Sequence, residues 1–341
     1  MPEPQPKPLI ETPPESITEP TPPPGPPLNL FQKVIFRILM FALWLGRTLP
    51  DRPLYRSAFA IGAGIYLLLP ERRRLVKSNL RRVVDWLVEN DMATPRVRRA
   101  ASDERSLDKL VRDCFGHWVV TYLEAAIGPR YSGEELDRRF RRVRPEVSAE
   151  ALSVPEPGQP GPIHMAMHFG SVDLSAIYGA RVGPLPLTGP MEFVEAPLAR
   201  AYFDRVRNDL DVTIVPLERA AGALTEALER GEAVGIVADR NIAGRGRLVE
   251  LFGGPVRLPV GPAMLAVQTG APLYLEAIER SDAGRWLGHT VPLRPEPGAT
   301  RREATRQIME QEVRAMERVI ARAPEQWTTL FFPIWEDEEE A

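Results

Sequence analysis

The sequence predicts an α/β fold with a mostly parallel central sheet and helices on its faces. From about residue 160 onward, short apolar runs bounded by Pro and Gly alternate with amphipathic segments. Such strand–helix alternation is typical of parallel sheets, because each crossover between parallel strands needs a long connection, usually a helix. In such sheets, ligands bind at the carboxyl ends of the strands.

The individual elements follow from their local patterns. We expect strands in the short apolar runs at 162–167, 212–217, 232–239 and 272–280, with a further short element at 186–190. We expect helices in the amphipathic segments at 171–183, 197–210, 220–231, 260–270 and 300–324. Upstream, residues 106–126 repeat apolar side chains at three- and four-residue spacing, which predicts an amphipathic helix with an aromatic stripe in the core.

The composition divides the chain into a tail, a folded domain and a short acidic end. Residues 1–27 are rich in Pro, Glu and Thr, which predicts a disordered tail. The folded domain is expected at 28–335, and an acidic tail at 336–341. Its first part, 28–70, holds two apolar segments, each shorter than the roughly 18–20 residues of a spanning helix. We expect two membrane-associated helices there, and the alternative is a pair of buried core helices.

Charge and cysteine content exclude several classes of protein. The net charge of −3 gives no support for a nucleic-acid partner. A single cysteine, Cys114, excludes an internal disulfide framework and a cysteine zinc site. The basic runs at 71–82 and 138–144 fit either solvated helix faces or surfaces that contact anionic lipid headgroups or a phosphorylated substrate.

The stretch IHMAMHFGSVD, at 163–173, carries the most informative polar residues. On a strand, His168 falls at the carboxyl end, where Gly170 allows a sharp turn. Ser171 is then a plausible N-cap, and Asp173 lies in the first turn of the next helix. We expect Asp173 to point back at His168 and orient the imidazole, so that His168 can take a proton from a substrate hydroxyl.

Three other interpretations of this stretch stay open on the residues alone. A zinc site built on His164 and His168 would lack the Glu of H-E-x-x-H and an obvious third ligand. A serine hydrolase would need G-x-S-x-G, which FGSVD does not supply. Two ordinary polar residues at a strand end are the third interpretation.

The stretch from His168 to Asp173 resembles the H-x4-D/E motif of membrane glycerolipid and glycolipid acyltransferases. Within them, the chain resembles the branch of lipid A lauroyl/myristoyl acyltransferases and phosphatidylinositol mannoside acyltransferases, and the latter more closely. The resemblance covers roughly residues 35–335, and Asp211 departs from it by standing where a glycine is usual. The other segments that carry it are RRRLVKSNLRRV with Asn79 and Leu80, FDRVRNDLDVTIVPL with Arg207, residues 234–275 with Asp239, Arg240, Phe252, Gly253 and Gly261, and PEQWTTLFFPIW at 324–335.

The resemblance implies a single αβα domain, an acyl-thioester donor and a lipid acceptor at the cytoplasmic face of the plasma (inner) membrane. It implies that His168 is the catalytic base and that Asp173 orients it. Arg207 is implied to lie near this pair or to hold an anionic substrate group, and Asp239 and Arg240 to line the same cleft. Neither a metal nor a cofactor is implied, since acyl-CoA or acyl-carrier protein serves as donor.

The resulting hypothesis is a peripheral or shallowly inserted enzyme that moves a fatty acyl group to a glycolipid or phospholipid hydroxyl. A phosphatidylinositol-mannoside-like acceptor is favoured, and a lipid A precursor of the Kdo-lipid A type is the alternative. The expected partners are membrane lipids and the thioester donor, which is acyl-CoA or acyl-carrier protein. No nucleic-acid partner is expected. Two hypotheses from other classes are a lipid hydrolase that uses the same residues with water, and a non-catalytic membrane scaffold.

Overall fold

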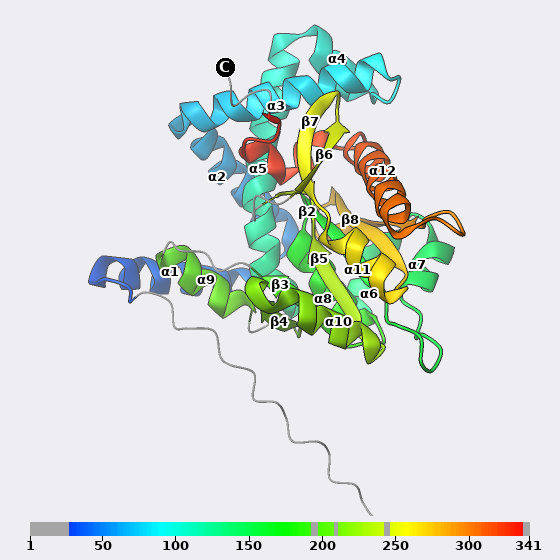
Figure 1. The fold of residues 1–341 in the computed structure, drawn as a ribbon. Coiled ribbons are helices and arrows are strands. Elements are labelled where there is room, and N and C mark those ends of the chain that lie inside the picture. The colour runs from blue at the N-terminus through cyan, green and yellow to red at the C-terminus, as the bar shows by residue number, and fades with distance from the viewer. Residues whose placement is uncertain (1–26, 192–196, 208–210, 242–245, 337–341) are drawn as a thin grey trace, which may run out of the picture.

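The computed structural model describes residues 27–191, 197–207, 211–241 and 246–336 (Figure 1). Its main sheet has seven strands in the order β1-β9-β8-β2-β5-β3-β4, and β6 and β7 form a separate hairpin. Neighbouring strands of the main sheet run parallel except for the antiparallel pair β8 and β9. The predicted α/β fold with a mostly parallel sheet is therefore confirmed. The strands are β1 (Phe140–Arg142), β2 (Ile163–Gly170), β3 (Leu187–Met191), β4 (Thr213–Pro216), β5 (Ala233–Val237), β6 (Gly246–Leu251), β7 (Gly254–Pro259), β8 (Leu273–Asp282) and β9 (Arg285–Leu293).

Helices cover both faces of this sheet. Along β2, Ile163, Met165 and Met167 pack into the large core cluster with residues of α10, α11 and α12. On the other face of the sheet, α8 packs against β2 and β8, and α7 packs against β9. The helices are α1 (Leu30–Gly46), α2 (Asp51–Leu68), α3 (Pro70–Glu89), α4 (Pro95–Ser102), α5 (Glu104–Ile127), α6 (Gly133–Arg139), α7 (Pro145–Ala151), α8 (Val172–Val182), α9 (Pro197–Arg207), α10 (Ala220–Glu229), α11 (Gly261–Thr269) and α12 (Arg301–Ile320). Short 3-10 turns lie at Gly128–Arg130, Leu217–Arg219, Pro324–Gln326 and Thr328–Phe331.

The expected elements from residue 160 onward are present, but three strands in that part of the chain, and β1 before it, were not anticipated. The β6–β7 hairpin lies in the Gly- and Arg-rich stretch that joins β5 to α11, and β9 follows β8 across a tight turn. The amphipathic helix expected at 106–126 is α5, whose Leu107, Leu110 and Phe115 are buried. The tails expected at 1–27 and 336–341 lie, except for residues 27 and 336, outside the described residues.

The N-terminal segment forms α1 and α2, and α2 packs closely along α5. Gly62 makes this approach possible, because a Cβ there would lie 2.5 Å from the carbonyl oxygen of Phe115. Leu54, Tyr55 and Ala58 are the buried face of α2, while Leu67 and Leu68 are exposed. Among the described residues, no helix has the length and apolar character needed to cross a membrane.

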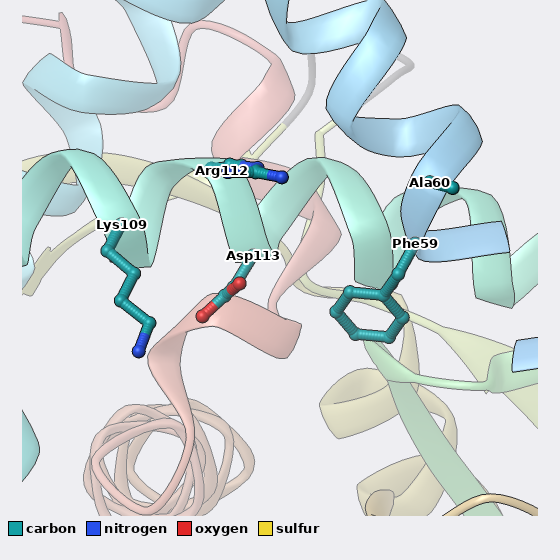
Figure 2. Close-up of a pocket in the computed structure, with 5 residues that line it drawn as sticks. All are labelled: Phe59, Ala60, Lys109, Arg112 and Asp113. Carbon is teal, nitrogen blue, oxygen red and sulfur yellow. The ribbon is translucent and has the colours of Figure 1, made fainter. Parts of the chain in front are cut away.

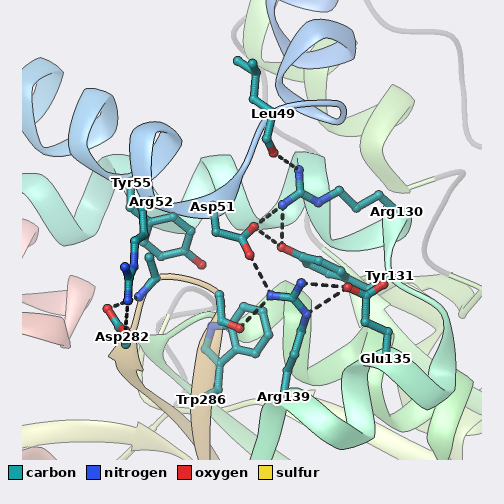
Figure 3. A network of polar contacts seen from close by, with 12 residues as sticks. Leu49, Asp51, Arg52, Tyr55, Arg130, Tyr131, Glu135, Arg139, Asp282 and Trp286 are labelled. Atoms are coloured by element: carbon teal, nitrogen blue, oxygen red, sulfur yellow. Dashed lines mark hydrogen bonds and ion pairs between the residues drawn. The ribbon is translucent and has the colours of Figure 1, made fainter.

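A polar network fixes the start of α2 to the rest of the domain (Figure 3). Asp51 accepts hydrogen bonds from Arg130, from the Tyr131 hydroxyl at 2.6 Å and from Arg139 Nη1 at 2.7 Å. Arg139 also donates to the carbonyl of Gly284, in the turn between β8 and β9. Burial acts to raise the pKa of Asp51, but the hydrogen bonds from Tyr131 and Arg139 outweigh it and lower that pKa. The network therefore ties an ionised carboxylate at the start of α2 to both α6 and the sheet.

Candidate functional site

A histidine and a buried aspartate meet where two neighbouring strands end. His168 lies near the end of β2, and Asp239 follows the end of β5. The two strands are parallel neighbours, with Ala166 opposite Val237, so their carboxyl ends share one edge of the sheet. His168 Nδ1 lies 2.7 Å from Asp239 Oδ1, with 28% of the His168 side chain exposed and none of Asp239.

The surroundings of Asp239 keep its carboxylate ionised. Its Oδ2 accepts hydrogen bonds from Trp327 Nε1 at 2.9 Å and from Thr329 Oγ1 at 2.7 Å. Burial raises the pKa of Asp239, but His168 and these hydrogen bonds more than offset it and lower the pKa to about 2. An ionised carboxylate can only accept, so His168 Nδ1 is the donor. In the neutral ring, Nε2 is then the nitrogen with a lone pair, as a general base requires.

The expected orientation of His168 by Asp173 needs correction. Asp173 does lie in the first turn of α8, as predicted, but the carboxylate that bonds the His168 ring is that of Asp239. The charge of Asp173 affects the pKa values of two tyrosines. Burial is the main reason that the pKa values of Tyr122 and Tyr202 are raised, and the charge of Asp173 raises both further. The carboxylate that meets His168 Nδ1 thus comes from the end of a neighbouring strand and not from the following helix.

The other predicted site residues have different positions. Arg240 follows Asp239 and stacks on the Phe332 ring at 3.6 Å. Its charge also acts on the Tyr122 hydroxyl, where it lowers the pKa that burial and Asp173 raise. Arg240 and Asp173 therefore both lie within electrostatic reach of the Tyr122 hydroxyl. Arg207 is the last residue of α9, and its side chain lies outside the described part of the structure.

His164 takes no part in the pair. It lies on β2 four residues before His168, and its Nδ1 is 3.4 Å from Glu276 Oε1. Within the described ranges, no three His, Cys, Asp or Glu side chains gather as metal ligands would. The zinc interpretation therefore gains no support from this part of the chain.

The turn after His168 requires a glycine and is held by hydrogen bonds to the carbonyl of that glycine. Gly170 has φ +62°, and a Cβ there would lie 1.6 Å from the carbonyl oxygen of Ile278, so only glycine fits. The Gly170 carbonyl accepts hydrogen bonds from Thr121 Oγ1 at 3.0 Å and from Arg280 Nη2 at 2.7 Å. Ser171 occupies the N-cap position of α8 as expected, although its hydroxyl makes no capping hydrogen bond.

Sequence reasoning missed three residues that contact the pair. Trp327 and Thr329 bond Asp239, and the Thr328 hydroxyl donates to the His168 carbonyl at 3.1 Å. The backbones of Phe169 and Trp327 also form an isolated antiparallel β-bridge. The stretch PEQWTTLFFPIW was recognised as part of the family resemblance, but no pattern within it indicates which residues reach back to the sheet.

Two hollows lie away from the pair. One, of about 340 Å³, lies between α2 and α5 and is lined by Phe59, Ala60, Lys109, Arg112 and Asp113 (Figure 2). Figure 2 shows the Asp113 carboxylate between the Lys109 side chain and the Phe59 ring. The other, of about 500 Å³, lies between α3 and the β6–β7 turn. Neither is lined by His168 or Asp239.

Comparison with known proteins identifies the family of the chain. Residues 26–335 match the family described as bacterial lipid A biosynthesis acyltransferase, and the chain belongs to that family. The predicted resemblance is therefore confirmed.

Curated relatives are similar over part of their length. A phosphatidylinositol mannoside acyltransferase of Mycobacterium tuberculosis is 39% identical over 71 residues, which cover 20% of this chain and 22% of that protein. One of Mycolicibacterium smegmatis is 30% identical over 116 residues, which cover 31% of this chain and 36% of that protein. The matched segments thus span well under two thirds of either relative.

A solved structure is similar at a low level. The 1-acyl-sn-glycerophosphate (LPA) acyltransferase PlsC of Thermotoga maritima is 16% identical, with a TM-score of 0.33. The match covers 73% of this chain and 98% of that one. At this TM-score, the similarity carries no weight in assigning the fold.

Proposed function

We propose that the chain transfers a fatty acyl group from an acyl thioester to a hydroxyl of a phosphatidylinositol-mannoside-like glycolipid. The observation that carries this proposal is the 2.7 Å contact between the half-buried His168 ring and the buried, ionised Asp239 at the carboxyl edge of the sheet. Such a pair supplies a general base, which acyl transfer to an alcohol needs. The acceptor class follows the names of the mycobacterial relatives.

The proposed reaction uses His168 Nε2 first as base and then as acid. Nε2 takes the proton of the acceptor hydroxyl while its oxygen attacks the thioester carbonyl. The tetrahedral intermediate then expels the sulfur, and His168 returns the proton to it, which yields an ester and a free thiol. Asp239 stabilises the imidazolium between the two steps. General-base help of this kind is worth roughly 10²–10⁴-fold in rate.

The remaining predicted residues act on the substrate side of this proposal. Arg240 follows Asp239 in the chain and its guanidinium stacks on the Phe332 ring; in this proposal it holds an anionic group such as the acceptor phosphate. Arg207 shares this role. Asp173, which lies within electrostatic reach of Tyr122 and Tyr202, acts at the rim of the site rather than on His168 Nδ1. The reaction needs neither metal nor cofactor, and the donor is acyl-CoA or acyl-carrier protein.

We further propose that α1 and α2 rest on the cytoplasmic face of the inner membrane, where the lipid acceptor lies. Large apolar side chains that would otherwise face water support this placement. On α1 and α2 they are Leu30, Phe31, Val34, Phe41, Trp44, Ile61, Leu67 and Leu68, each at least 48% exposed. Loss of vesicle binding in a Phe31→Ser/Trp44→Ser variant, measured by co-sedimentation, is the expected outcome; undiminished binding would contradict this placement.

The activity is tested with purified full-length protein, vesicles that contain the mannosylated phosphoinositide, and a radiolabelled acyl thioester. We expect label to move into the lipid with wild type and with His164→Gln, the matched histidine control on the same strand. We expect His168→Ala to abolish the transfer. Parallel reactions compare acyl-CoA with acyl-carrier protein and the mannoside with a lipid A precursor. Release of free fatty acid without any labelled lipid would indicate a hydrolase, and no turnover at all a scaffold.

A further inference from the structure

A short C-terminal segment contacts both members of the His168–Asp239 pair. We call residues 327–332 the clamp. Trp327 and Thr329 both donate to Asp239 Oδ2, at 2.9 and 2.7 Å. The hydroxyl of Thr328 donates to the backbone carbonyl of His168 at 3.1 Å. Three consecutive residues therefore hold the carboxylate on one side and the strand that carries the imidazole on the other.

These contacts determine which oxygen of Asp239 meets the imidazole. Because two donors engage Oδ2, rotation of the fully buried carboxylate would break both hydrogen bonds. Oδ1 is thereby kept in line with His168 Nδ1. The hydrogen bond made by one ring nitrogen decides which nitrogen of a neutral imidazole carries the proton. Fixing the orientation of the Asp239 carboxylate therefore favours the tautomer of neutral His168 that carries its proton on Nδ1.

The clamp is itself held from α3. Asn79 is fully buried, and its Nδ2 donates to the carbonyls of Leu330 and Phe332, each at 2.9 Å. The nitrogen of a primary amide carries two N–H groups, so one Asn side chain can donate to both carbonyls without burying a charge. The Phe331 ring between these carbonyls stacks on Trp118 at 5.0 Å between ring centroids. A polar residue that the sequence resemblance marked without a role thus fixes the backbone of the clamp.

We propose that Trp327 and Thr329 are positioning residues that keep the neutral His168 ring protonated on Nδ1, with Asn79 holding the clamp in register. This inference rests on the proposed acyl transfer for its consequence, since only the Nδ1-protonated ring offers Nε2 to the acceptor hydroxyl. The clamp touches no reacting atom. Trp327 and Thr329 act on the chemistry through Asp239, so their loss is expected to alter turnover rather than substrate binding.

The direct test is the tautomer of His168, read by nitrogen NMR of histidine-labelled full-length protein at a pH where the ring is neutral. The chain has only four histidines, and the His168 signals are those that vanish in His168→Ala. We expect wild type and Thr329→Ser, which keeps the hydroxyl, to show a protonated Nδ1 and an unprotonated Nε2. Thr329→Val, which has nearly the same shape as wild type, and Trp327→Phe are each expected to show a larger share of the Nε2-protonated ring than wild type. An unchanged tautomer in both folded variants would overturn the proposal.

Kinetics supply the second readout. Thr329→Val is expected to lower kcat roughly 10- to 100-fold with KM within about twofold, because a hydrogen bond to a charged group is lost without a substrate contact. Thr290→Val is the matched control, since Thr290 donates to the Glu276 carboxylate at 3.0 Å, and it is expected to leave kcat unchanged. A KM effect alone in Thr329→Val would contradict a positioning role. If the tautomers are as expected but the wild-type protein transfers no acyl group, the proposed function is overturned and the positioning role of the clamp is not.

Discussion

The buried ion pair of Glu124 and Arg280 offers a sharp test of what supports the site. Glu124 Oε2 accepts from Arg280 Nε at 2.7 Å, and the two side chains are 1% and 3% exposed. Glu124 Oε1 accepts from the Tyr55 hydroxyl at 2.6 Å and from Trp286 Nε1 at 2.8 Å. One carboxylate therefore joins α2, α5, β8 and β9, and through Arg280 it also supports the Gly170 turn.

The perturbation is Glu124→Gln, which keeps the shape and removes the charge. It leaves the Arg280 cation buried without its counter-charge and turns one acceptor oxygen into a donor that faces another donor. Breaking a buried pair from one side typically costs about 3–5 kcal/mol of unfolding free energy, and we expect a loss in that range. Arg280→Met is expected to cost a similar amount, because it leaves the buried Glu124 carboxylate without its counter-charge.

The assay is urea unfolding of both single variants and of Glu124→Gln/Arg280→Met, followed by tryptophan fluorescence. In the double variant no charge is left uncompensated, so its loss is expected to be smaller than the sum of the single losses by about 2 kcal/mol or more. Strictly additive losses, or a cost below about 1 kcal/mol for Glu124→Gln, would refute the account of this network.

Two further predictions concern the turn and a second buried carboxyl. Gly170→Ala is expected to destabilise the fold by more than about 2 kcal/mol and to abolish transfer, because the new residue would have φ +62° and a Cβ 1.6 Å from the carbonyl oxygen of Ile278. The measurement is the melting temperature of this variant beside that of Gly222→Ala, whose Cβ would meet nothing within 4 Å. Equal melting temperatures of the two variants would contradict the prediction. Burial, and then the nearby Asp239, raise the pKa of the fully buried Glu312 well above 4.5, so above about pH 4.5 the unfolded chain releases a proton that the folded chain keeps. The unfolding free energy of wild type should then fall with rising pH, by up to about 1.4 kcal/mol per unit, until the folded-state pKa is passed. Glu312→Gln lacks this pH dependence. In urea unfolding from pH 5 to 8, the unfolding free energy of Glu312→Gln should therefore rise relative to that of wild type as the pH rises. The same pH dependence in both proteins would argue against a neutral Glu312.

The fold was predictable from sequence because its signals are local. Apolar runs and amphipathic helices alternate along the chain, and each can be recognised from neighbouring residues alone. The unexpected β6–β7 hairpin shows the limit, since its Gly- and Arg-rich strands lack a clear alternation of apolar and polar residues. Strand order also has no local signal. That β5 lies beside β2 depends on how all the helices pack, and not on either strand.

The site shows the same division between local and distant information. His168 could be placed at a strand end and Asp173 in the following helix, because both depend on a turn of a few residues. Asp239 was assigned to the cleft, but its contact with His168 spans 71 residues and depends on the strand order. Trp327 and Thr329 contact Asp239 across 88 and 90 residues. Only the folded structure brings these groups together.

The central claim is that Asp239, rather than Asp173, holds the His168 imidazole for proton transfer. The most direct measurement compares kcat for acyl transfer by Asp239→Asn and Asp173→Asn with wild type, at saturating donor and acceptor. We expect Asp239→Asn to lower kcat by about 10³–10⁴-fold, because the amide no longer holds the proton on Nδ1. Asp173→Asn is expected to lose far less. A larger loss in Asp173→Asn, or near-normal turnover in Asp239→Asn, would contradict the account.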